Sequence, residues 1–164
     1  MQNESMTAAP RHSLRRVFGK FCDLLARKLP FIPSKFRVFL QRLHGVNFTD
    51  WRTVFIGEDV YFDSIYPERI TVGRDVRLTA GIRVLTHFLD TQFVPQPGRP
   101  FRFYVGDVVI GEGVFVGTAV VFAKPVRIGD WAVIGANSVI TKDVPSCAIV
   151  AGAPAKIVGY RKIQ

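Results

Sequence analysis

From residue 110 to residue 145 the chain repeats a six-residue pattern: IGEGVF, VGTAVV, FAKPVR, IGDWAV, IGANSV and ITKDVP. An upstream stretch has the same pattern, with VGRDVR, LTAGIR and then VLTH. The second position of each downstream hexad is Gly or another small residue, which we expect to let the backbone turn at each corner of a coil. The first position always holds a bulky apolar residue, namely Ile110, Val116, Phe122, Ile128, Ile134 and Ile140.

A period of six matches neither the 3.6-residue period of an α-helix nor the two-residue alternation of a strand. It indicates a short strand and a turn repeated, with a large side chain pointing inward from each unit. Three units would close a triangular coil of 18 residues, and stacked coils would bury a continuous aliphatic ladder. A β-sandwich is disfavoured, because its strands do not keep one phase over 36 residues. The sequence therefore predicts an all-β solenoid.

Composition limits the alternatives. The chain has 164 residues, of which 48% are hydrophobic, so it can bury a core and is not broadly disordered. We see no apolar stretch of about 18 residues that could span a membrane and no secretory signal. Cys22 and Cys147 have neither metal-type spacing nor a disulfide framework. We therefore expect a cytoplasmic protein.

The motifs resemble those of the hexapeptide-repeat acyltransferases, in particular the sugar O-acetyltransferase and xenobiotic acetyltransferase branch. The resemblance covers roughly residues 54–160 and includes ITKDVP followed by AIVAGAPAKIV, and VLTH at the end of the upstream run. It implies a left-handed parallel β-helix, a homotrimer, acetyl-CoA as cosubstrate and no metal. The chain departs from the branch at Phe115, where a tryptophan is common.

We expect two regions, a basic helical arm over residues 1–45 and the β-helix over residues 46–164. Three prolines and four phenylalanines interrupt the repeat over residues 88–104, which predicts an extruded loop. Pro154 is placed as at the start of a helix, so a short C-terminal helix is expected over about 154–162.

His87 is the candidate catalytic residue. It ends the upstream run, borders the loop and matches the active-site histidine of the family, which implies a general base for acyl transfer. Asp90 is the nearest carboxylate in sequence and a candidate to orient the ring, or else it shapes the loop. Asp63 falls loosely where the sugar-acetylating branch binds its acceptor. Which group orients His87 stays open at this point.

The resemblance also implies an acetyl-CoA groove between adjacent β-helices. Its small lining residues would stand at coil corners, a backbone amide near Thr118 would face the thioester carbonyl, and lysines would meet the coenzyme phosphates. The alternative for the lysines is an ordinary solvated surface. The candidates are Gly117, Thr118, Gly135, Ala136, Thr141, Lys142 and Lys156.

The arm carries most of the net charge of +9, because residues 1–42 hold nine Lys and Arg against two acidic residues. Nucleic acid is a disfavoured partner, since no reading motif accompanies the charge. Within residues 13–29 the apolar side chains share one helical face, which favours packing on the β-helix, together with contact to an anionic membrane surface at the inner face of the membrane. That face consists of Leu14, Val17, Phe18, Phe21, Leu25 and Leu29.

The leading hypothesis is an acetyl-CoA-dependent O-acetyltransferase that acts on a sugar hydroxyl in bacterial surface-polysaccharide biosynthesis. The enzymatic alternative is inactivation of an antibiotic hydroxyl. The alternative from another class is a non-catalytic β-helix that acts as an assembly scaffold. A zinc enzyme is disfavoured, because His87 is the only histidine in the repeat region.

Overall fold

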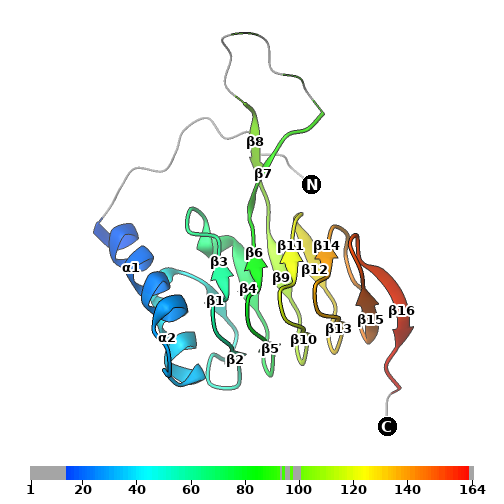
Figure 1. Ribbon diagram of the computed structural model, residues 1–164, viewed down its shortest axis with the longest axis horizontal. Helices are drawn as coiled ribbons and strands as arrows, with labels where there is room; N and C mark the ends of the chain where they lie inside the picture. The colour runs from blue at the N-terminus through cyan, green and yellow to red at the C-terminus, as the bar shows by residue number, and fades with distance from the viewer. Residues whose placement is uncertain (1–13, 93, 95–96, 98–100, 163–164) are drawn as a thin grey trace.

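A computed structural model of the chain describes residues 14–92, 94, 97 and 101–162. Its body is a stack of coils whose short strands form three sheets, parallel except for the last strand, β16, with two helices at one end (Figure 1). The first sheet contains β1 (Asn47–Phe48), β4 (Ile70–Val72), β9 (Val108–Ile110) and β12 (Val126–Ile128). The second contains β2 (Phe55–Ile56), β5 (Arg77–Leu78), β10 (Phe115–Val116), β13 (Val133–Ile134), β15 (Ala148–Ala151) and β16 (Lys156–Tyr160). The third contains β3 (Tyr61–Phe62), β6 (Arg83–Val84), β11 (Val121–Phe122) and β14 (Val139–Ile140).

The hexad predicts the register of the stack. Val116 pairs with Ile134 and Phe122 pairs with Ile140, one coil of 18 residues apart in each case. All six first-position side chains are at most 2% exposed. The fifth position is buried as well, so each hexad contributes two residues to the core rather than the one that we expected. Those fifth-position residues are Val114, Val120, Val126, Ala132, Ser138 and Val144.

The small second residue of the hexad has a different role from the one expected. Backbones of successive coils meet at this position, and a Cβ on Gly73 would lie 2.6 Å from the carbonyl oxygen of Gly111. The left-handed turn residues are other positions, and L-residues such as Ala119 and Asn137 adopt a φ of 57° there. The second position is thus small because the next coil packs against it, and the bend itself is made elsewhere.

The repeat is interrupted by a hairpin that projects from the side of the stack (Figure 1). Its stem pairs β7 (His87–Leu89) with β8 (Phe103–Val105) in antiparallel fashion. The segment expected as a loop over residues 88–104 therefore begins and ends in strand. Positions 93, 95–96 and 98–100 of this segment lie outside the described residues. The coils on either side of the hairpin still pair in register, as Leu78 does with Val116.

Two helices, α1 (Leu14–Lys28) and α2 (Ser34–His44), precede the first coil. They run antiparallel, because Arg37 near the start of α2 donates to the carbonyl of Ala26 near the end of α1 at 2.9 Å. At the other end of the pair, Gly19 lies against the backbone of His44. Among the described residues, no helix has the length and apolar content that crossing a bilayer requires.

Helix α2 covers the open end of the solenoid. Val38 is fully buried and belongs to the same core cluster as Val54 and Phe62 of the first coil. Helix α1 packs on α2 mainly through small and polar residues, and its large apolar side chains other than Leu25 face outward. The packed residues of α1 are Gly19, Cys22, Asp23 and Ala26. The expected face is therefore not the one that packs: Phe18 and Phe21 are 54% and 55% exposed.

The expected C-terminal helix over about 154–162 is wrong. Residues 156–160 form β16, which pairs antiparallel with β15 at the end of the second sheet. The segment KIVGY holds β-branched and aromatic residues. By pairing with β15, it satisfies the N–H and C=O groups that an open sheet edge would leave free.

Candidate active site

His87 and Asp63 come together from adjacent coils. Asp63 follows β3 and His87 begins β7, three residues beyond the end of β6. Because β3 pairs with β6, with Phe62 opposite Val84, the residues after these two strands share one corner of the stack. There Nδ1 of His87 lies 2.5 Å from Oδ2 of Asp63.

Asp63 is fully buried and its carboxylate is saturated with donors. Oδ1 accepts from the backbone N–H of Ile65 at 2.8 Å, and Oδ2 accepts from that of Thr86 at 2.9 Å. Burial alone would raise the pKa of Asp63, but these two hydrogen bonds and the His87 contact outweigh it and hold the pKa below its ordinary value. The carboxylate is therefore ionised at neutral pH.

The charge on Asp63 fixes the tautomer of His87. An ionised carboxylate only accepts hydrogen bonds, so the proton of the neutral imidazole resides on Nδ1. The lone pair is then on Nε2, and the His87 side chain is 29% exposed. A neutral imidazole held in this way can accept a proton at Nε2 from a bound hydroxyl or amine.

Asp90 lies away from this pair. It sits just beyond β7, where its carboxylate accepts from the backbone N–H of Gln92 at 3.1 Å, and its own N–H donates to the carbonyl of Arg102 at 2.8 Å. These are contacts that shape the start of the loop. The structure thus brings Asp63 to His87 and places Asp90 in the hairpin.

Two residues that the sequence did not single out attach the hairpin to the stack. Tyr104 of β8 packs on Phe88 of β7 with ring centroids 5.4 Å apart. Lys124, one coil further on, donates to the Tyr104 hydroxyl at 3.2 Å and lies 5.8 Å from its ring centroid. These contacts hold the base of the hairpin next to His87.

The seven candidate residues for acetyl-CoA do not form one group within the chain. Gly117 and Gly135 follow β10 and β13, so with Thr118 and Ala136 they stack at the corner between the second and third sheets. The contact is close, because a Cβ on Gly117 would lie 2.6 Å from the backbone nitrogen of Ala136. Thr118 and Ala136 are exposed on this column.

The remaining candidates lie elsewhere. Thr141 and Lys142 follow β14, at the same corner of the stack as Asp63, and Lys142 is exposed. The backbone hydrogen bonds along this corner run from Asp63 to the coil of His87 and on to that of Thr141. Lys156 begins β16 at the far end of the second sheet and is exposed.

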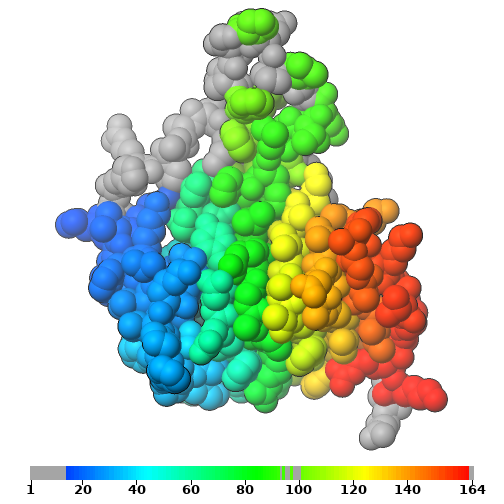
Figure 2. All heavy atoms as spheres, in the orientation of Figure 1, coloured from blue at the N-terminus to red at the C-terminus, as the bar shows by residue number. Residues whose placement is uncertain are grey.

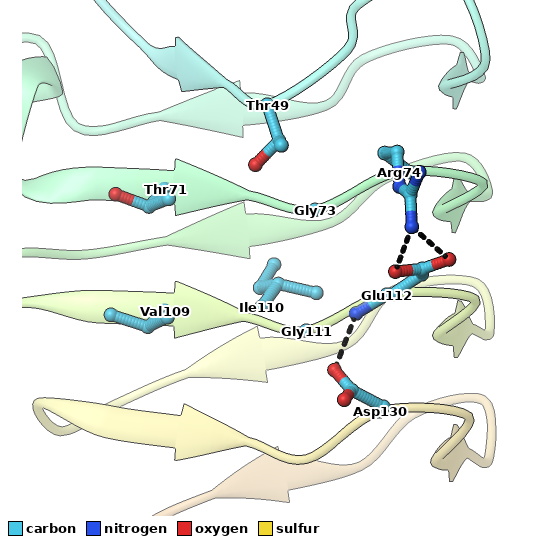
Figure 3. A pocket seen from close by; sticks show the side chains of 9 residues that line it. All are labelled: Thr49, Thr71, Gly73, Arg74, Val109, Ile110, Gly111, Glu112 and Asp130. Atoms are coloured by element: carbon cyan, nitrogen blue, oxygen red, sulfur yellow. Dashed lines mark hydrogen bonds and ion pairs between the residues drawn. The ribbon is translucent and has the colours of Figure 1, made fainter.

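A separate depression of about 260 Å³ lies on the first sheet and the corner that follows it (Figure 3). Arg74 closes one side of it through a bidentate contact with Glu112 at 2.8 and 3.0 Å. The backbone N–H of Glu112 donates in turn to Asp130 at 2.8 Å. His87 does not line it, and these contacts join three successive coils, so we assign the depression to the packing of the stack.

Among residues 14–92, 94, 97 and 101–162, no cluster of three or more His, Cys, Asp or Glu side chains could hold a metal ion.

Comparisons with known proteins agree with this architecture. Residues 107–142 match the family model described as "Bacterial transferase hexapeptide (six repeats)". A solved structure of a galactoside acetyltransferase in complex with coenzyme A superposes with a TM-score of 0.62 at 22% identity, over 89% of this chain and 80% of that one. That likeness concerns the fold, and it supports the left-handed form of the β-helix.

Two curated relatives support the family assignment. The "Putative acetyltransferase YvoF" of Bacillus subtilis is 31% identical over 137 residues, covering 82% of this chain and 71% of its own. The galactoside O-acetyltransferase of Escherichia coli is 42% identical over 121 residues, covering 69% of this chain and 57% of its own. The family that the sequence motifs indicated is thus confirmed, and the chain belongs to the hexapeptide-repeat acetyltransferases.

Proposed function

We propose that this chain transfers the acetyl group of acetyl-CoA directly to a hydroxyl of a sugar, with His87 as the general base. The observation that carries the proposal is the His87–Asp63 pair, because it leaves Nε2 of a neutral imidazole as a proton acceptor beside the hairpin. The reaction needs a general base, because a sugar hydroxyl is a weak nucleophile until it loses its proton.

In the proposed step the acceptor oxygen forms a bond to the thioester carbonyl carbon while its proton passes to Nε2 of His87. The carbon–sulfur bond then breaks, and the coenzyme leaves as a thiolate that takes up the proton from His87. Asp63 stays ionised throughout and stabilises the imidazolium that exists between the two proton transfers. No acetyl-enzyme is formed on this route.

The exposed corner residues are suited to an extended coenzyme. Thr118 and Ala136 present small side chains on successive coils, so that backbone groups along the column can be approached closely. Lys142 and Lys156 offer exposed cations for phosphates. We infer that Gly117, Gly135 and Thr141 support this surface, and that a backbone amide near Thr118 stabilises the oxyanion.

The division of these residues between two corners supports a homotrimeric site. Thr118 lies at one corner of the triangular coil, and His87 lies at the next corner along the chain. Where two copies stand side by side in a ring, one corner of a copy can face a different corner of its neighbour. We propose that the donor bound along the Thr118 column of one copy is served by His87 of the adjacent copy.

The acceptor class rests on the relatives. The galactoside O-acetyltransferase is named for a sugar acceptor. On this basis we propose a sugar or a polysaccharide precursor as the acceptor, in surface-polysaccharide biosynthesis.

The test is release of coenzyme A thiol from acetyl-CoA in the presence of candidate sugars, nucleotide-linked sugars and lipid-linked sugars, with an antibiotic hydroxyl such as that of chloramphenicol included. We expect acetyl transfer to at least one sugar, and we expect His87→Ala to reduce it by about 10²–10⁴-fold without loss of the fold or of acetyl-CoA binding. Transfer to the antibiotic alone would contradict the sugar assignment. A folded His87→Ala protein with more than about a tenth of the wild-type turnover would contradict the assignment of the base. Absence of transfer to any acceptor would favour a scaffold.

A further inference from the structure

The two helices carry a large exposed apolar surface that the catalytic proposal does not use. We call it the outer face, and it consists of residues that are 38% to 90% exposed. They are Leu14, Val17, Phe18, Phe21 and Leu24 from α1 and Phe36, Phe39 and Leu43 from α2. The helices occupy one end of the molecule (Figure 2). Proteins that stay monomeric in water rarely expose apolar patches of this kind, and such patches mark sites of contact with a partner or a membrane.

The outer face is continuous across both helices. The seam between them is filled by a small buried cluster that contains Cys22, Ala26 and Leu40, with Leu25 packed against it. Leu25 lies one helical turn from Phe21, so it borders the exposed stripe of α1. In the same way Leu40 lies one turn from both Phe36 and Leu43. The two stripes therefore meet at the seam.

The stripe on α2 extends into the first coil. The rings of Phe36 and Phe39 stack with centroids 6.3 Å apart, and the ring of Phe39 lies 6.2 Å from that of Trp51. Arg52 lies over Trp51 at 5.1 Å. An aromatic group of this kind, with a cation at its edge, is the combination that anchors proteins at the boundary between lipid headgroups and acyl chains.

The charge around the outer face has a single sign. Residues 14–44 contain eight Lys and Arg and a single acidic residue, Asp23. Asp23 is 2% exposed and is paired with Arg27 at 2.9 Å and with Gln41 at 3.0 Å. The exposed basic side chains of the helix pair are Arg15, Lys20, Lys28, Lys35 and Arg42.

The apolar stripe and the positive charge together favour an anionic membrane over a second copy of the chain as the partner of the outer face. A second copy of the chain, placed face to face, would bring two positive surfaces together without acidic partners from this region, which is unfavourable. An anionic bilayer surface accepts both features, because its acyl boundary takes the apolar stripe and its headgroups take the cations. We infer that the outer face binds an anionic phospholipid surface and so places the enzyme at a membrane. This inference does not depend on the identity of the acceptor.

Sedimentation of the full-length protein with vesicles tests the inference. The vesicles are phosphatidylcholine alone or mixed with phosphatidylglycerol, at low and high salt. We expect binding to the mixed vesicles that weakens with salt, and about a tenfold loss of binding in Phe18→Ser/Phe21→Ser and in Lys20→Glu/Arg42→Glu. The matched controls are Trp131→Ser/Val158→Ser, whose parent side chains are 47% and 65% exposed on other parts of the surface, and Arg127→Glu/Lys162→Glu. Both controls should bind as the wild type does.

The result that overturns the inference is an absence of wild-type binding, or an equal loss in the variants and their matched controls. An equal loss would mean that total charge or total exposed apolar surface governs binding, wherever it lies on the molecule. The oligomeric state of each variant is measured by light scattering. A change of state in Phe18→Ser/Phe21→Ser with unchanged vesicle binding would assign the outer face to contact between copies. If that variant does not fold, the Lys20→Glu/Arg42→Glu pair carries the test. Quenching by brominated acyl chains of a Phe21→Trp variant that also carries Trp51→Phe and Trp131→Phe, with Val158→Trp in the same background as control, then reports whether the side chain enters the bilayer.

Discussion

The imidazole of His87 and the carboxylate of Asp63 lie 2.5 Å apart although 24 residues separate them in the chain. The pairing orients the histidine from the coil that precedes its own. Asp63 is in turn held by backbone N–H groups on both sides, from Ile65 and from Thr86. The orientation of the proposed base is therefore built into the contact between two coils.

Replacing Asp63 by Asn should reduce acetyl transfer about 10²–10⁴-fold with little change in the KM for acetyl-CoA. The amide of Asn can donate to Nδ1, which stabilises the tautomer that carries its proton on Nε2 and cannot act as a base. The double variant with His87→Ala should be no slower than His87→Ala alone. Steady-state kinetics with the acceptor identified by the thiol-release screen checks this. Additive losses in the double variant would show that Asp63 acts separately from His87.

His44 makes folding sensitive to acid. It is 7% exposed, its Nδ1 lies 3.2 Å from Oε1 of Gln41, and its Nε2 is buried without a partner. Burial lowers the pKa of His44 below its ordinary value, so the unfolded chain binds a proton there that the folded chain does not. The free energy of unfolding should therefore fall as the pH drops below about 6.5, by up to about 1.4 kcal/mol per pH unit.

Urea unfolding between pH 7.5 and 5.5 measures this slope. His44→Asn keeps a donor for Gln41 but does not titrate, so we expect a flatter dependence in that variant. His87→Ala is the control, because it removes the other described histidine. This variant should keep the pH dependence of the free energy of unfolding that His44 causes. An unchanged slope in His44→Asn would assign the pH dependence to other groups.

Gly73→Ala should destabilise the stack by about 1–3 kcal/mol, because the added Cβ would lie 2.6 Å from the carbonyl oxygen of Gly111, which belongs to the backbone of the next coil. Gly159→Ala is the matched control, since its Cβ would lie 4.0 Å from the side chain of Ile149 and in ordinary contact. Thermal unfolding should separate the two variants by several degrees. Equal midpoints would mean that the coils can shift apart at this corner without cost.

Lys142→Ala should raise the KM for acetyl-CoA by about three- to tenfold, the effect of one exposed cation on a phosphate, and should leave kcat nearly unchanged. The same substitution should have less effect with a donor that lacks the 3′-phosphate. Lys162→Ala serves as the control for loss of an exposed lysine near the same end of the chain. If both donors respond equally, Lys142 does not contact that phosphate.

The repeat could be read from the sequence because one inward residue per hexad is enough to set the register of a parallel stack. Val116 and Ile134 are 18 residues apart and pair as the period requires. The Asp63–His87 contact could not be read in this way. Phe62 and Val84, which pair, are 22 residues apart, because the turn after β3 contains a short 3₁₀ helix over Pro67–Arg69. The longer turn shifts Asp63 out of the regular phase.

The two ends of the solenoid were predicted less well, and for a shared reason. At an end the hexad no longer decides the structure, and what covers the last coil depends on tertiary contact. Lys156–Tyr160 forms a strand because β15 offers it an open edge. Helix α1 packs through Gly19 and Ala26 because these small residues allow close approach to α2, which amphipathicity alone does not reveal.

The placement of α2 on the first coil has a consequence for activity. In a stack where each coil touches only its neighbours, unfolding begins by fraying at an end. Asp63 belongs to the first coil and His87 to the second, so the proposed catalytic pair lies in the part of the solenoid that frays once Val38 no longer covers it. Loss of that cover would break the contact between Asp63 and His87 while the later coils stay paired. Enzymatic activity therefore reports on the integrity of the helical end of the molecule. On heating, activity should be lost at a lower temperature than the one at which the β-sheets unfold.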